Sequence, residues 1–179
     1  MTEPERDGPP RAVLIAAVII AVAAAGTVLA IAAKRNTAQP VAVATVPAPQ
    51  ASDERCTALL AKVPDQLGDY RRADLASPAP EGVAAWRIDA AAEPVVLRCG
   101  LDRPDDFVVG APLQMVNAVS WFEASGPSAS TWYAVDHGAQ ATYVALTLPQ
   151  GSGPTPIQTI SELIEKVMPP RPLDPAPAR

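Results

Sequence analysis

The stretch at residues 94–101 reads Pro-Val-Val-Leu-Arg-Cys-Gly-Leu, and its apolar pattern predicts a central β-strand. Successive side chains of a strand point to opposite faces of the sheet. One face is therefore expected to carry Val95, Leu97, Cys99 and Leu101, and the other Val96 and Arg98.

Further strand-like runs lie on both sides of this stretch. They are residues 83–88, 114–122, 131–135 and 141–148. The last two flank Asp136-His137-Gly138-Ala139, which is typical of a hairpin turn. The strand-like runs do not alternate with helices, so nothing in the sequence indicates a parallel sheet.

A helix is expected on each side of the strands. The first carries an apolar stripe from Cys56 to Leu67, capped by Ser52 or Asp53, with its regular part ending near Lys62 or Val63.

The second helix is expected to start at Thr155 as the N-cap, with Pro156 in the first position and Gln158 completing a capping box. It should end before Pro169-Pro170. We therefore expect an α+β fold, an antiparallel sheet of four to five strands with the N- and C-terminal helices on one face, preceded by one transmembrane helix.

Residues 12–33 contain no charged side chain and would span ~33 Å as a helix. This length fits a hydrocarbon core of ~30 Å, and we interpret the segment as a membrane anchor with the N-terminus inside. The number of flanking cations is equal on the two sides, Arg6 and Arg11 before the segment and Lys34 and Arg35 after it, so the count alone does not indicate the orientation. A signal peptide cleaved near Ala30-Ile31-Ala32, which would release a secreted domain, is the alternative.

Composition then divides the chain into five parts. We expect a cytoplasmic head at 1–11, the transmembrane helix at 12–33, a Pro/Ala-rich extended tether at 34–52, an extracytoplasmic domain at 53–168 and a disordered Pro-rich tail at 169–179. The tether, if fully extended, would reach ~50 Å from the membrane.

The overall composition excludes several classes of function. The chain has 179 residues and a formal net charge of −5, which argues against nucleic acid as a partner. One histidine and two cysteines leave little material for a metal site, and we expect neither metal nor cofactor.

Cys56 and Cys99 are expected on facing apolar surfaces of the first helix and the central strand. A disulfide between them would require an oxidising compartment, in agreement with a domain outside the membrane. Two buried free thiols are the alternative.

Three groups of residues carry candidate chemistry. Arg71 and Arg72 could fork onto a carboxylate or phosphate of an envelope protein, an anionic cell-wall ligand or a lipid, although the simpler interpretation is that they are surface residues that balance nearby acids. His137 and Asp136 could activate Ser120, Ser128 or Ser130, but no nucleophile-elbow motif is present and no catalytic residue is assigned. Asp102, Asp105 and Asp106 could hold calcium, although a solvated loop is the simpler interpretation.

Several runs resemble an uncharacterised actinobacterial family of membrane or secreted proteins, domain-of-unknown-function family 3515. They are residues 56–64, 70–72, 94–100, 116–121 and 143–149, of which Leu-Arg-Cys-Gly and the paired cysteines are the most specific. Family members often carry Trp-Gly-Asp-Pro where this chain has Ala90-Ala91-Ala92-Glu93, and an arginine near Asp136-His137. The resemblance implies a cell-envelope location and no known activity.

The sequence thus favours a non-enzymatic, membrane-anchored envelope protein with an extracytoplasmic binding or scaffolding domain. An envelope enzyme acting on cell wall or lipid would need a polar cleft with a perturbed titrating group. A lipid or glycan carrier would need an internal cavity.

Overall fold

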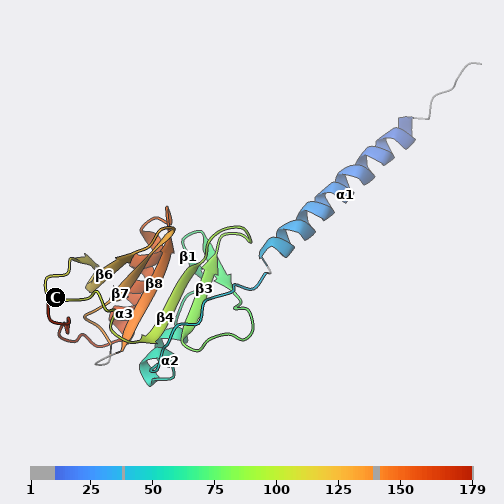
Figure 1. Ribbon diagram of the computed structural model, residues 1–179. Helices are drawn as coiled ribbons and strands as arrows, with labels where there is room; N and C mark the ends of the chain where they lie inside the picture. The colour runs from blue at the N-terminus through green and yellow to red at the C-terminus, as the bar shows by residue number, and fades with distance from the viewer. Residues whose placement is uncertain (1–10, 38, 139–141, 179) are drawn as a thin grey trace, which may run out of the picture.

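The computed structural model describes residues 11–37, 39–138 and 142–178. Within these residues it contains three helices and one antiparallel sheet of eight strands (Figure 1). The α+β class agrees with the sequence analysis, but the strand number does not, because we expected four to five strands. The sheet is larger because short hairpins lengthen it at both ends.

The elements follow one another in a simple order. The helices are α1 (Arg11–Thr37), α2 (Glu54–Leu60) and α3 (Thr155–Val167). The strands are β1 (Gln66–Leu67), β2 (Tyr70–Ala73), β3 (Val83–Arg87), β4 (Val95–Leu101), β5 (Leu113–Val116), β6 (Val119–Ser125), β7 (Ala129–Ala134) and β8 (Tyr143–Pro149). Their order in the sheet is β1-β2-β3-β4-β8-β7-β6-β5, so β4 is central and β1 and β5 are edges.

Tight turns explain the strands that the sequence analysis missed. β1 and β2 are joined through Gly68, whose φ of 62° suits a glycine. Residues 114–122, which we expected as one strand, are two strands joined at Asn117, whose φ is 54°. Asparagine tolerates this left-handed conformation better than most residues, which allows the reversal.

One face of the sheet packs against α2 and α3. Trp86 and Trp121 are fully buried there. Each indole N–H has a partner, the Pro64 carbonyl at 2.8 Å for Trp86 and the Ser161 hydroxyl at 2.9 Å for Trp121. Asp53 caps α2 by accepting from the Arg55 amide at 2.8 Å, as one of our two capping choices predicted. The helix ends at Leu60, earlier than expected.

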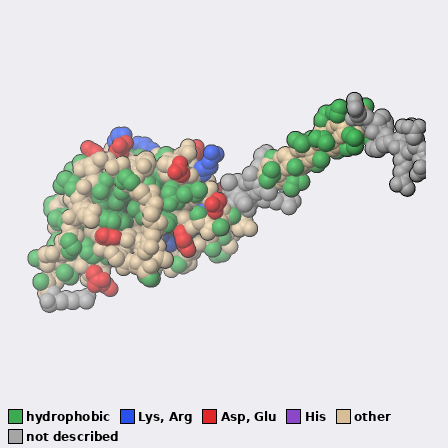
Figure 2. Space-filling model, turned by 90° about the horizontal axis from the view of Figure 1, so that it is seen from above, with side chains coloured by type: hydrophobic (Ala, Val, Ile, Leu, Met, Phe, Trp, Pro, Cys, Tyr) green, Lys and Arg blue, Asp and Glu red, His purple; other side chains and the backbone are tan. Residues whose placement is uncertain are grey.

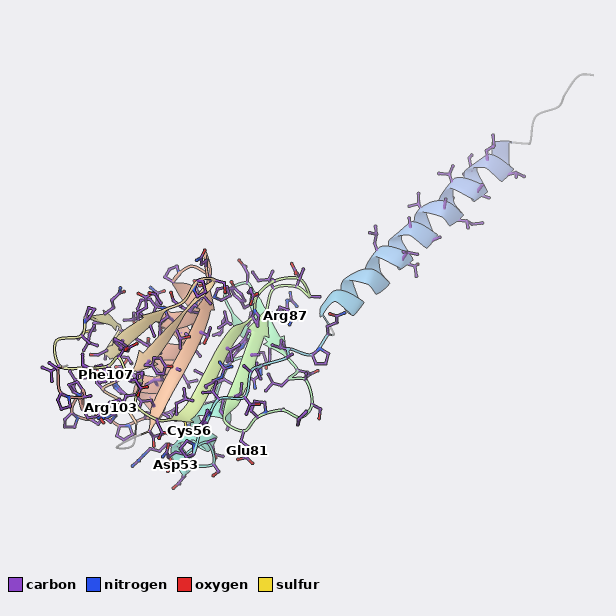
Figure 3. The ribbon with its side chains drawn as sticks, viewed as in Figure 1. Asp53, Cys56, Glu81, Arg87, Arg103 and Phe107 are labelled. Carbon is purple, nitrogen blue, oxygen red and sulfur yellow. A yellow bond between two sulfur atoms is a disulfide. The ribbon has the colours of Figure 1, made fainter. Side chains whose placement is uncertain are left out.

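A disulfide joins Cys56 of α2 to Cys99 of β4, with 5.5 Å between their Cα atoms (Figure 3). The expected meeting of these two residues is therefore present. Leu101 differs from the expectation, because a register shift between Cys99 and Leu101 moves its side chain to the other face. Gly100 lies in this irregularity with a φ of 92°.

The second face of the sheet is covered by extended chain instead of helices. Residues 39–51, which we call the N-terminal strap, cross β3 and β4 (Figure 1). Val41 is fully buried, and its amide donates to the Asp74 carbonyl at 2.7 Å. Val43 packs beside it because residues two apart in an extended chain share a face. The segment is extended as expected, but it lies on the domain and does not act as a tether.

The C-terminal segment also differs from the expected disordered tail. Residues 169–178, which we call the C-terminal strap, run past Tyr143 to Val108. The Arg171 amide donates to the Asp136 carbonyl at 2.7 Å, and the Val109 amide donates to the Ala176 carbonyl at 2.8 Å. Prolines exclude a regular strand here, but the amides between them still find backbone partners.

α1 lies apart from the domain in Figure 1. Its segment Ala12–Ala30 has a mean hydropathy of 2.7 and none of it is buried. Such a helix could be a membrane anchor or a signal sequence. The expected cytoplasmic head falls almost entirely on residues 1–10, and part of the expected turn on residues 139–141, which lie outside the described residues.

Replacing both Cys56 and Cys99 with alanine should lower the free energy of unfolding by about 4 kcal/mol. The closed loop spans a sequence separation of 43 residues, and the chain-entropy relation gives this magnitude. Urea unfolding of the full chain in detergent measures it. Reductant should lower the stability of the wild type and leave that of the variant unchanged. A difference in the free energy of unfolding between wild type and variant below about 1 kcal/mol would contradict stabilisation by the disulfide.

Tyr143→Phe should test the attachment of the C-terminal strap. The Tyr143 hydroxyl donates to Asp174, which also accepts from Arg171 at 2.8 Å. Burial, together with the bond to Asp174, raises the pKa of Tyr143 to about 12 from 10.0. The variant keeps the ring under the Arg171 guanidinium and should lose about 2 kcal/mol at pH 8.

The same tyrosine predicts an alkaline pH dependence. Because the folded pKa lies above the unfolded one, its contribution is complete below pH 10 and disappears as pH rises toward about 12. The free energy of unfolding in urea should therefore fall less between pH 8 and pH 11 for Tyr143→Phe than for the wild type. The loss is reduced and not abolished, since burial also raises the pKa values of Tyr70 and Tyr133. Equal losses would refute the linkage.

Candidate binding groove

An open groove lies on the helix-bearing side of the sheet, near the edge strand β5. Its volume is about 390 Å³, within the range of small-ligand pockets. Strands β5, β7 and β8 form one wall, and the β8–α3 loop with the first turn of α3 forms the other. The lining residues are Gln114, Val116, Ser130, Trp132, Leu148, Pro149, Gln150, Gly151, Ser152, Gly153, Pro154, Ile157 and Gln158.

The loop sequence Gly151-Ser152-Gly153-Pro154 builds the second wall. Both glycines have positive φ, 76° and 70°, and an added Cβ at either would meet nothing within 4 Å. They serve the turn of the backbone and leave open space beside it.

The expected capping box is absent from α3. Pro154 is the N-cap and makes no side-chain cap hydrogen bond, while the Gln158 amide bonds to the Pro154 carbonyl at 3.1 Å. The helix starts one position earlier than expected, and the Gln158 side chain lines the groove. This glutamine was assigned a capping role by sequence reasoning, which missed its place in the groove.

The groove lining combines apolar surface with polar groups and contains no charged side chain. Three glutamines and two serines supply amide and hydroxyl groups, and Val116, Leu148 and Ile157 supply apolar surface. The Gln150 side chain donates to the Pro127 carbonyl at 3.2 Å, which holds it across the loop. Without a cation in the lining, a phosphate or carboxylate would leave water and gain no ionic partner. The lining therefore suits an uncharged ligand.

Trp132 differs from the other two tryptophans in its exposure to solvent. Trp86 and Trp121 are fully buried, as expected for core residues, whereas Trp132 is half-buried and lines the groove. Within the described part of the chain, its indole N–H donates no hydrogen bond to protein. Trp132 therefore offers both an aromatic surface and a donor to a ligand.

The two arginines singled out by the sequence lie on opposite faces of β2. Arg72 stacks on Trp86, with its guanidinium carbon 5.0 Å from the ring centroid. Burial lowers the pKa of Arg72, against the opposing effect of Asp65 and Asp74. Arg71 lies on the other face, opposite Arg87 of β3. Because side chains of successive strand residues point to opposite faces, the structure does not bring the two guanidinium groups together on one face of the sheet.

His137 and Asp136 are joined as a pair but make structural contacts. The His137 Nδ1 lies 2.7 Å from Asp136 Oδ1, and both Asp136 oxygens accept from the backbone amide of Ser120 at 2.9 Å. His137 is buried and does not line the groove, whereas Ser130 does. The arrangement positions a turn, and among the residues that the structure describes no serine hydroxyl forms a hydrogen bond with the imidazole.

The three aspartates after β4 do not gather. Asp102, Asp105 and Asp106 are all exposed. Among the residues that the structure describes, no three histidine, cysteine, aspartate or glutamate side chains lie close enough to hold a metal ion.

Comparison with known proteins adds a family and no activity. No curated protein and no solved structure matches the chain. The model of the family described as "Protein of unknown function (DUF3515)" matches residues 14–173, which include most of α1, the N-terminal strap, the whole sheet and the C-terminal strap up to residue 173. The chain therefore belongs to this family of proteins of unknown function.

Proposed function

We propose that this protein is a single-pass, membrane-anchored binding protein whose extracytoplasmic domain takes an uncharged ligand into the groove. The groove carries the proposal: an open space of about 390 Å³ that combines a tryptophan, amide and hydroxyl groups, and no charged side chain. Such a lining can bind a ligand by apolar contact and hydrogen bonds. Its lining contains no histidine, carboxylate, lysine or cysteine that could act as an acid or base beside the two serine hydroxyls.

Two features support an anchored domain outside the membrane. The apolar segment Ala12–Ala30 is long enough to cross a bilayer. The Cys56–Cys99 disulfide is stable in oxidising compartments, which lie on the far side of the plasma membrane. Together they favour an N-terminus inside and the domain outside. A cleaved signal that releases the domain is the competing topology.

The chemistry of the groove favours a neutral glycan among uncharged ligands. The apolar face of a sugar ring can lie on an aromatic ring such as Trp132, while glutamine and serine side chains bond hydroxyl and acetamido groups. The groove is open and not enclosed, which suits one segment of a longer chain. An oligomer of N-acetylglucosamine is therefore the first probe, because it is neutral and carries both hydroxyl and amide groups.

Gln114→Glu and Gln158→Glu should each weaken binding of N-acetylglucosamine oligomers by about tenfold or more. Each change places a carboxylate in an uncharged groove, where desolvation of the charge opposes ligand entry. Tryptophan fluorescence titration of the full chain in detergent measures the affinity. Gln66→Glu is the matched control, because Gln66 is exposed on β1 and outside the groove, and it should bind like the wild type.

Two results would count against this function. Wild-type protein that binds acidic oligosaccharides as tightly as neutral ones would contradict the role of the uncharged lining. Groove variants that bind the neutral oligomer as the control does would place the binding site elsewhere on the domain.

A further inference from the structure

The N-terminal strap leaves almost no free chain between the membrane helix and the domain. α1 ends at Thr37, and the Gln39 carbonyl already accepts from the Arg87 side chain at 3.4 Å. Val41 is fixed on both sides, since its amide bonds to Asp74 and its carbonyl accepts from Ala76 at 2.9 Å. Four residue steps from Thr37 to Val41 span at most ~14 Å.

Helix length fixes where this junction lies if α1 is the anchor, an assumption that this inference shares with the proposed function. α1 has 27 residues and is therefore ~40 Å long, against a hydrocarbon core of ~30 Å. The excess of ~10 Å reaches into the headgroup layer. The domain then begins at the headgroups and not at the end of a long tether.

Arg87 and Arg71 lie at this end of the domain. Figure 3 shows Arg87 on the side from which α1 leaves, opposite the end that carries Asp53 and Cys56. Arg71 is the direct cross-strand partner of Arg87. Next to Arg87, the apolar side chain of Ile88 is 45% exposed. Figure 2 shows basic and acidic side chains together on the part of the domain that adjoins α1.

The hydrogen-bonding capacity of Arg87 is only partly used within the protein, and Arg71 is exposed to solvent. Neither forms a salt bridge among the described residues, and the Arg87 Nε is buried without a hydrogen-bond partner. Like charges directly opposite on adjacent strands destabilise a sheet. The nearby Asp89 is engaged in its own loop, where it accepts from the amides of Ala91 and Ala92.

We propose that Arg71 and Arg87 together bind the phosphate of an anionic lipid headgroup in the leaflet beside the domain. A phosphate between the two guanidinium groups relieves their repulsion and can accept hydrogen bonds from both. Ile88 enters the interfacial region beside them. The site is separate from the groove, and it holds the domain against the bilayer surface.

The full chain in lipid nanodiscs tests the site. With phosphatidylglycerol in place of phosphatidylcholine, the domain's melting temperature should rise by roughly 5 °C, and amide hydrogen exchange in β2 and β3 should slow. Arg71→Gln/Arg87→Gln should abolish both effects. Arg55→Gln/Lys62→Gln is the matched control, since it removes two exposed cations at the α2 end, and it should keep them.

Each other outcome has one meaning. An equal rise in the two double variants, or no rise in the wild type, would overturn the headgroup site. So would inorganic phosphate that reproduces the effect in phosphatidylcholine nanodiscs, because the ligand would then be free phosphate. Alkaline extraction of membranes checks the anchor separately: protein released into solution would refute anchoring, whereas retained protein without lipid dependence would refute only the headgroup site.

Discussion

The sheet has two apolar faces, and among the described residues two short helices, α2 and α3, pack against it. α2 and α3 fill one face, where Trp86 and Trp121 form a thick core. Where the N-terminal strap crosses it, the other face is lined by small residues such as Ala85 and Val96, over which a helix would leave voids. Extended chain is thinner than a helix, and it fits. The N-terminal strap is therefore part of the core through Val41, whereas the C-terminal strap covers the region of Tyr143 with residues that are themselves half-buried or exposed.

Close contact between the N-terminal strap and β4 depends on glycine. A Cβ added at Gly100 would lie 2.2 Å from the Ala51 amide nitrogen, and one added at Gly82 would lie 2.6 Å from the Cys99 carbonyl oxygen. The backbone at both positions also has positive φ, so a side chain would be strained as well as crowded. This crossing lies beside the disulfide, and together they join the strap, α2 and β4 into one unit.

Features that depend on local sequence were predicted well. Periodicity indicated α3 and β4, and the paired apolar positions of Cys56 and Cys99 indicated the disulfide. The β5–β6 turn was missed because the strand-like pattern looks continuous across Asn117. The only sequence signal for the turn is that asparagine tolerates a positive φ better than most residues. The straps were missed for another reason: proline-rich composition describes how a segment bends, but not whether a sheet face beside it needs cover.

The groove could not have been predicted, since it combines distant parts of the chain. Gln114 and Trp132 meet the β8–α3 loop only because β5, β6, β7 and β8 are neighbours in the sheet. The glycines of residues 151–153 were a local signal for a loop at that point, but not for a wall of a ligand site. The misassigned Gln158 shows the same limit, because a capping role and a binding role use the same residue type.

The positions of the groove and the arginine pair bear on each other. The C-terminal ends of β3 and β8 lie at the same end of the sheet. Trp86 near the end of β3 pairs with Val95 at the start of β4, and the next β4 residue, Val96, pairs with Thr147 near the end of β8. Figure 1 shows this end directed toward α1. A domain held against the headgroups through Arg71 and Arg87 would therefore keep the groove near the bilayer surface. Under both proposals together, the uncharged ligand would lie at the membrane surface, as a glycan attached to a lipid does, because a ligand far from the bilayer would not reach a groove held this close to it.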